Sequence, residues 1–195
     1  SGQEAPASSG QVLPDPPGIG VRLGQLQIDS VLIDETLTGQ AMAFDLAGSA
    51  DLAQSGAGAV NLQVHQTLGG TGNLALDGAF DLGLDQIAFR LDAGEEPGGV
   101  LITLLGIEGA PAVAVMAKLE GAASDFAGQV TLDAGEGLSA DLDLSGNMSA
   151  AAVNVTVGGT IDVDSFLDAT TRPLVGEAIT LDLDVAMAGE LLTIR

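Results

Sequence analysis

The stretch Ile179-Thr-Leu-Asp-Leu-Asp-Val-Ala-Met187 decides the fold class, because apolar residues stand at every second position. A period of two is the spacing of side chains on one face of a β-strand, so this stretch predicts a strand with one apolar face and one mainly polar face. The same alternation recurs from about residue 19 to the C-terminus, interrupted by turns such as Gly69-Gly70 and Gly158-Gly159. The sequence therefore predicts an all-β protein of roughly a dozen strands.

The strands are expected to form an antiparallel sheet, because the connections between them are short and a parallel crossover needs a dozen or more residues. An antiparallel sheet with one apolar face must cover that face with a second sheet, with helices, by closing on itself or with a ligand. The pattern leaves two architectures open. One is an elongated, curled antiparallel sheet with an open apolar groove, and the alternative is a β-sandwich with a dry core.

Three segments depart from the alternation. Residues 1–18 are rich in Pro, Gly and Ser and are expected to be a disordered leader or linker, which leaves residues 19–195 as one β-rich unit. Residues 97–106 begin with Pro97 and end with Gly106, the asymmetry of a short helix. Residues 164–173 start with residues that cap helices and end with proline, so a second short helix is expected there.

The composition excludes several classes of function. The chain has 195 residues with 5 Lys+Arg against 27 Asp+Glu, a net charge of −22, which disfavours binding to nucleic acid and electrostatic docking on anionic lipid. It contains no cysteine, so disulfides, zinc–thiolate sites and thiol catalysis are excluded. Aromatic residues make up only 3%, without Trp or Tyr, so stacking platforms for bases are not expected.

No constellation of residues predicts an enzyme, a metal site or a cofactor. The pairs Asp141/Asp143 and Asp182/Asp184 would each share one strand face, and without calcium-loop spacing we interpret them as solvated. His65 lies among polar residues with no nucleophile motif, which indicates a surface histidine.

The apolar positions of the strands are the candidate functional residues. They are mainly aliphatic, which predicts a smooth wall able to line a groove for acyl chains. The candidates are Leu62, Val64, Ile87, Phe89, Leu91, Val113, Val115, Leu138, Leu142, Leu144, Val153, Val155, Ile179, Leu181, Leu183 and Val185.

Three stretches carry a resemblance to a known family. They are Phe44-Asp-Leu-Ala-Gly-Ser-Ala-Asp-Leu52, then Glu96-Pro-Gly-Gly-Val-Leu-Ile-Thr-Leu-Leu-Gly-Ile-Glu-Gly-Ala-Pro111, and the stretch 159–176, which contains Phe166-Leu167 and Arg172-Pro173. Together they resemble the periplasmic part of the TamB family, the inner-membrane component of the translocation and assembly module. Within the third stretch, Asp168 stands where the family often has Pro and Thr171 where it usually has Tyr.

The resemblance implies a segment of a long, groove-like β-sheet in the periplasm, within a protein anchored in the inner membrane by a segment that this chain lacks. It implies phospholipid transport between the inner and outer membranes, a role in outer-membrane biogenesis, and a partner of the TamA barrel type reached through the parent protein. Two alternatives stay open: a chaperone-like module that binds strands of outer-membrane proteins by β-augmentation, and a secreted structural β-sandwich. Self-association through strand edges is also expected, since unpaired edges template pairing.

Overall fold

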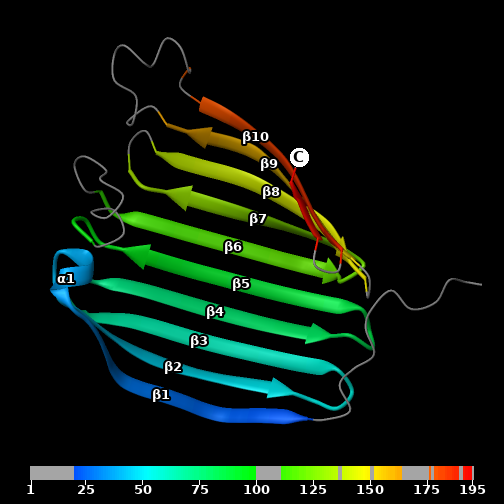
Figure 1. Ribbon diagram of the computed structural model, residues 1–195, viewed down its shortest axis with the longest axis horizontal. Coiled ribbons are helices and arrows are strands. Elements are labelled where there is room, and N and C mark those ends of the chain that lie inside the picture. The colour runs from blue at the N-terminus through cyan, green and yellow to red at the C-terminus, as the bar shows by residue number, and fades with distance from the viewer. Residues whose placement is uncertain are drawn as a thin grey trace, which may run out of the picture.

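The computed structural model describes residues 20–99, 111–135, 138–149, 152–163, 176, 178–188 and 191–194. These residues form eleven strands in a single antiparallel sheet, in which each strand pairs with the next along the chain (Figure 1). The prediction of an all-β, antiparallel fold is confirmed. The strands are β1 (Val21–Ile33), β2 (Met42–Leu52), β3 (Ala57–Leu68), β4 (Gly72–Asp81), β5 (Gln86–Glu95), β6 (Val113–Ala122), β7 (Asp125–Asp133), β8 (Ser139–Met148), β9 (Ala152–Asp162), β10 (Ala178–Ala188) and β11 (Leu191–Ile194).

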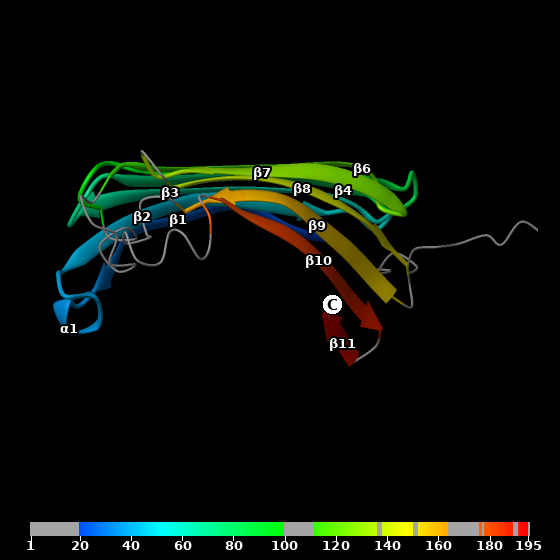
Figure 2. The same ribbon diagram turned by 90° about the horizontal axis from the view of Figure 1, so that it is seen from above.

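The sheet is open and does not curl into a groove, so that part of the expectation was wrong. Figure 2 shows a single layer from above, with α1 and β11 on the same side of the central strands. Curling a sheet requires bulges or glycine kinks repeated along it. The register shifts that the structure records lie only in the pairs β1–β2 and β2–β3, and the pairs from β3 to β11 run in regular register.

The alternative of a β-sandwich is also wrong for the described part of the chain, where all eleven strands belong to one sheet. A sandwich needs connections that carry the chain from one layer to the other. Here each strand pairs with the strand that precedes it in the chain, so all eleven strands stay in one layer.

A four-residue helix, α1 (Glu35–Thr38), joins β1 to β2 and was not predicted. The carboxylate of Asp34 accepts a hydrogen bond from the backbone N–H of Thr36 at 2.9 Å, and Gly39 ends the helix in the left-handed region at φ 80°. One turn is too short to leave a helical period in the sequence. The first predicted helix, residues 97–106, is described only at residues 97–99, which are not helical. The rest of it, the second predicted helix at 164–173 and the predicted leader lie outside the described residues.

The first strand breaks the period of two, which explains why its alternation is hard to read from the sequence. Leu23 pairs with Ala50 and Leu26 with Gly48, and a second shift separates Ile28 from Val31. Each shift adds residues to β1 and changes the parity of the positions that face the apolar side.

Few residues are fully buried, as a single layer dictates. The buried apolar residues of the described chain are Met42, Ala43, Ala123, Phe126 and Ala134. No helix in the described part of the chain combines the length and apolarity needed to cross a membrane.

Candidate functional site

One face of the sheet is apolar from edge to edge. Residues directly opposite each other in antiparallel strands project from the same face, so the strand registers trace continuous rows across the sheet. One row crosses ten strands and contains only aliphatic residues and glycine: Leu26, Gly48, Leu62, Leu76, Leu91, Ala117, Val130, Leu142, Gly159 and Leu181.

The neighbouring rows have the same chemistry. Those on either side consist of Ile28, Leu46, Val64, Leu74, Ala93, Val115, Leu132, Ala140, Ile161 and Ile179, and of Leu23, Ala50, Val60, Gly78, Phe89, Leu119, Gly128, Leu144, Val157 and Leu183. A further row includes Phe80, Ile87, Phe126, Val155 and Val185. We call the surface formed by these rows the apolar face.

The structure places every predicted lining residue except Leu138 on the apolar face. Val113 is opposite Glu95, and Val153 is opposite both Met148 and Met187. Leu138 precedes β8 and lies in the turn after β7, where its carbonyl accepts a hydrogen bond from the N–H of Ala134 at 2.9 Å. The sequence prediction therefore extended the alternation of β8 one residue too far towards the N-terminus, into the turn.

The apolar face is not the buried core that a sandwich would give. Every predicted lining residue is half-buried except Ile179, which is 43% exposed. Leu23, on the same face in the edge strand β1, is 45% exposed. No second layer from the described residues covers these side chains. The aliphatic side chains shield one another along and across the strands, but no described residue covers the surface that they form.

Aromatic rings on this face lie flat over glycines of the adjacent strand. A Cβ atom on Gly58, Gly78 or Gly146 would come within 2.3 to 2.6 Å of the ring of Phe80, Phe89 or Phe126, the residue opposite each glycine. A ring lying over a cross-strand glycine protects its backbone and occupies the space of the missing side chain. The rings therefore add little height, and the face stays low and smooth.

The apolar face contains a hollow of about 380 Å³ at the end of the sheet near α1. Its polar lining residues are Gln66, Asn73 and Glu95, of which Gln66 and Glu95 are buried, at 3% and 8% exposure. The amide of Gln66 lies over Gly72, where a Cβ atom would come within 2.8 Å of its Oε1 atom. The other walls are mainly aliphatic or aromatic and include Ile33, Met42, Phe44, Leu74 and Val115.

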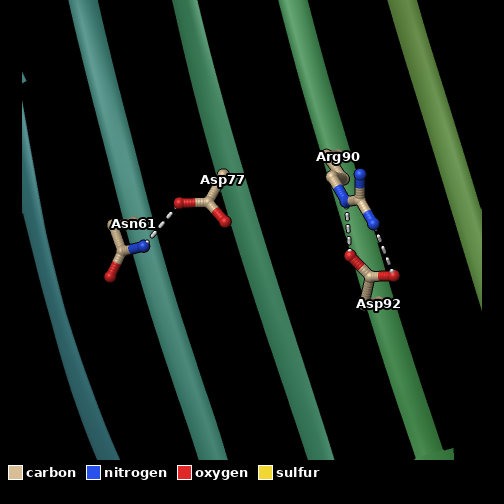
Figure 3. A network of polar contacts seen from close by, with 4 residues as sticks. All are labelled: Asn61, Asp77, Arg90 and Asp92. Atoms are coloured by element: carbon tan, nitrogen blue, oxygen red, sulfur yellow. Dashed lines mark hydrogen bonds and ion pairs between the residues drawn. The ribbon is translucent and has the colours of Figure 1, made fainter.

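The opposite face is polar and carries most of the charged side chains of the described strands. Figure 3 shows Asn61 donating to Asp77 at 2.6 Å, and Arg90 beside Asp92 with Nε–Oδ2 and Nη2–Oδ1 distances of 2.7 and 3.3 Å. Hydrogen bonding to Arg90 lowers the pKa of Asp92, and the same contact raises the pKa of Arg90.

Every basic side chain of the described residues is close to an acidic one on this polar face. Arg22 pairs with Asp51, and Lys118 pairs with Glu120 at 2.9 Å. These pairs are exposed and act mainly to keep the face hydrated.

The residues that suggested chemistry in the sequence also lie on the polar face. His65 is exposed opposite Asp45 and Asn73. Asp141 accepts a hydrogen bond from Gln129 at 2.9 Å, and Asp184 accepts one from the hydroxyl of Thr156 at 2.7 Å. Among the described residues, no group of three or more His, Cys, Asp or Glu side chains is arranged to hold a metal ion.

Sequence reasoning missed two parts of the apolar face. The residues Leu23, Leu26 and Ile28 of β1 were not recognised, although allowing the alternation to slip at a bulge recovers them. The polar border of the hollow was missed because Gln66 and Glu95 read as the polar ends of their strands, and no local pattern shows that the two strand ends meet.

No protein family, no curated protein and no solved structure matches this chain.

Proposed function

We propose that the apolar face binds the acyl chains of phospholipids and guides them along the sheet without catalysing a reaction. The observation that carries the proposal is the set of uninterrupted cross-strand rows of aliphatic residues and glycine, uncovered by any other described element. Exposed apolar surface that is continuous over many strands is costly in water, so it is expected to have an occupant.

Binding energy for an acyl chain needs no specific contact. Each CH₂ group removed from water contributes about 0.8 kcal/mol, so a chain lying across several strands gains several kcal/mol from burial alone. The interaction has no preferred direction along the face, because hydrophobic burial depends on area and not on orientation. A smooth wall of Leu, Val, Ala and flat Phe rings therefore suits a lipid that moves.

The polar face supports the same proposal by keeping an open, one-sided sheet in solution. Its side chains are mainly acidic or uncharged, and a net charge of −22 favours solubility. We place the chain within a periplasmic protein of the TamB type that spans the two membranes, with an outer-membrane barrel of the TamA type as partner of the parent protein. That placement rests on the sequence resemblance.

Native mass spectrometry tests the binding. The chain, incubated with a diacyl phospholipid and exchanged into volatile buffer, is expected to retain one or more lipids, and glycerophosphate, which has the same head-group chemistry without acyl chains, is expected not to bind. A chain that stays lipid-free over a range of lipid concentrations while remaining folded would overturn the proposal. Equal retention of phospholipid and glycerophosphate would do the same, because it would assign the binding to the head group.

A further inference from the structure

Two polar side chains interrupt the apolar face, and both lie at its end near α1. In strands β2 to β10, the described residues that project from this face are apolar or glycine, with the exception of Gln66 and Glu95. Gln66 is opposite Phe44, and Glu95 is opposite both Gly72 and Val113. Both polar residues are more than nine-tenths buried, so they do not serve to keep the sheet hydrated.

Glycines make room for these two side chains at the border of the hollow. Gly72 lies in β4, between the strands that carry Gln66 and Glu95, and a Cβ atom on it would come within 2.8 Å of Oε1 of Gln66. The side chain of Glu95 lies against Gly99, where a Cβ atom would clash with its Cγ and Cδ atoms. The hollow that they border, of about 380 Å³, has a size typical of small-molecule sites.

The polar groups at this border offer hydrogen-bond acceptors. Nε2 of Gln66 donates to the carbonyl of Leu68 at 3.2 Å, and its Oε1 is the atom nearest to the position that a Cβ on Gly72 would take. Glu95 adds a carboxylate, which only accepts hydrogen bonds and can accept several at once. A ligand that complements both oxygens is therefore a hydrogen-bond donor, and a positive charge on the donor strengthens the bond.

The charges on the two faces favour a cationic donor at this place. The basic side chains of the described residues, Arg22, Arg90 and Lys118, all pair with acidic residues on the polar face. Glu95 is the charged residue on the apolar side of β2 to β10, so an anionic group that entered the hollow would meet a like charge. A carboxylate beside apolar walls is stabilised by a hydrogen-bonded counter-charge.

We propose that the hollow binds the primary ammonium group of an aminophospholipid whose acyl chains lie on the adjoining rows of the apolar face. This inference rests on the proposed function, because the acyl chains supply most of the binding energy. Leu74, Ala93 and Val115 line the hollow and belong to the aliphatic row that ends at Ile179. That continuity favours a lipid over a free amine, and the three N–H donors of an ammonium match the oxygens of Gln66 and Glu95.

Three dihexanoyl phospholipids that differ only in their head group test the inference on the wild-type chain. The ethanolamine and choline lipids have the same net charge, but only the ethanolamine lipid has N–H donors. Isothermal titration below the micellar concentration is expected to give a dissociation constant roughly tenfold lower for the ethanolamine lipid than for the choline lipid. The anionic glycerol lipid, which has no amine, is expected to bind no more tightly than the choline lipid.

Substitution of the carboxylate tests which residue provides the selectivity. Glu95→Gln keeps the size of the side chain and removes its charge, so the preference for the ethanolamine lipid is expected to fall to about twofold or less while the choline lipid still binds. The matched control is Glu120→Gln, which changes an exposed carboxylate that pairs with Lys118 on the polar face. The control is expected to keep the full preference. The wild-type comparison needs no variant, so it decides the question even if Glu95→Gln does not fold.

The outcomes separate this inference from the proposed function. Equal dissociation constants of the wild type for the ethanolamine and choline lipids would overturn the ammonium site and leave acyl-chain binding intact, whereas failure to bind any of the three lipids would overturn both. A preference that survives Glu95→Gln, or is lost equally in Glu120→Gln, would contradict the assignment to Glu95. Glycerophosphoethanolamine, the head group without acyl chains, is expected to bind more weakly than the lipid, and equal binding would assign the hollow to a free amine and contradict the lipid.

Discussion

Leu142 and Asp143 are neighbours in β8, yet they belong to two surfaces with opposite chemistry. Leu142 lies between Val130 and Gly159 on the apolar face, and Asp143 lies between Gln129 and Gly158 on the polar face. The same difference separates adjacent residues in the strands on either side. The comparison teaches that in a single-layered sheet the binding surface and the solubilising surface are interleaved in the sequence, so a change of one position exchanges one chemistry for the other.

The largest effect is expected for an aromatic ring that lies on the apolar face. Phe126 is 5% exposed and its ring covers Gly146, so Phe126→Ala removes a buried ring and uncovers the glycine backbone. We expect a loss of about 3–5 kcal/mol in the free energy of unfolding, measured by urea denaturation.

Met116 is the matched control, because it is a large apolar residue on the polar face and is 54% exposed. Met116→Ala is expected to change the free energy of unfolding by less than about 0.5 kcal/mol. If the two substitutions cost the same, the apolar face contributes no more to stability than the polar one, and the contrast between the faces fails.

A smaller change in stability with a large change in binding is expected for a charge on the apolar face. Leu142→Arg places a guanidinium among aliphatic side chains that are only half-buried, so it is expected to cost about 1–3 kcal/mol of stability. Its effect on acyl-chain binding is expected to be larger, roughly tenfold or more in dissociation constant, because a bound chain must desolvate the charge.

Asp143→Arg carries the same new group on the polar face, and we expect it to leave both stability and lipid binding nearly unchanged. Isothermal titration of the folded variants with a short-chain phospholipid separates the two substitutions. Equal loss of binding in both variants would show that net charge, and not the apolar face, controls the interaction.

The smallest effect is expected for the polar network of Figure 3. Hydrogen bonding to Arg90 lowers the pKa of Asp92, so the pair stabilises the fold above the carboxyl's ordinary pKa and the stabilisation is lost as pH falls through the lowered pKa. Arg90→Gln should therefore lower stability slightly at neutral pH, and its difference from the wild type should disappear in strong acid. A difference that persists below that pKa would contradict this assignment to Asp92.

The sequence predicted the strands well because their signal is local. Alternation in residues 140–144 or 179–187 is set by neighbours two positions apart, and the structure confirms the common face that it indicates. The openness of the sheet was not predictable in this way, since a curled sheet, a sandwich and a flat layer share the same period of two.

The hollow beside α1 could not be predicted from the sequence either, because its polar residues come from the ends of different strands. Gln66 ends one strand and Glu95 ends another, and only the register of β3, β4 and β5 places both beside Gly72. The shifted alternation of β1 is an intermediate case, because Leu23, Leu26 and Ile28 fit a period of two once a bulge is allowed between them.

Photo-cross-linking at adjacent residues tests the central claim most directly. A benzophenone side chain is introduced at Leu142 in one variant and at Asp143 in another, and each is irradiated with a labelled diacyl phospholipid. If acyl chains bind the apolar face, the label is expected on the variant at position 142 and largely absent from the variant at position 143. Equal labelling of both, or stronger labelling at position 143, would contradict the account.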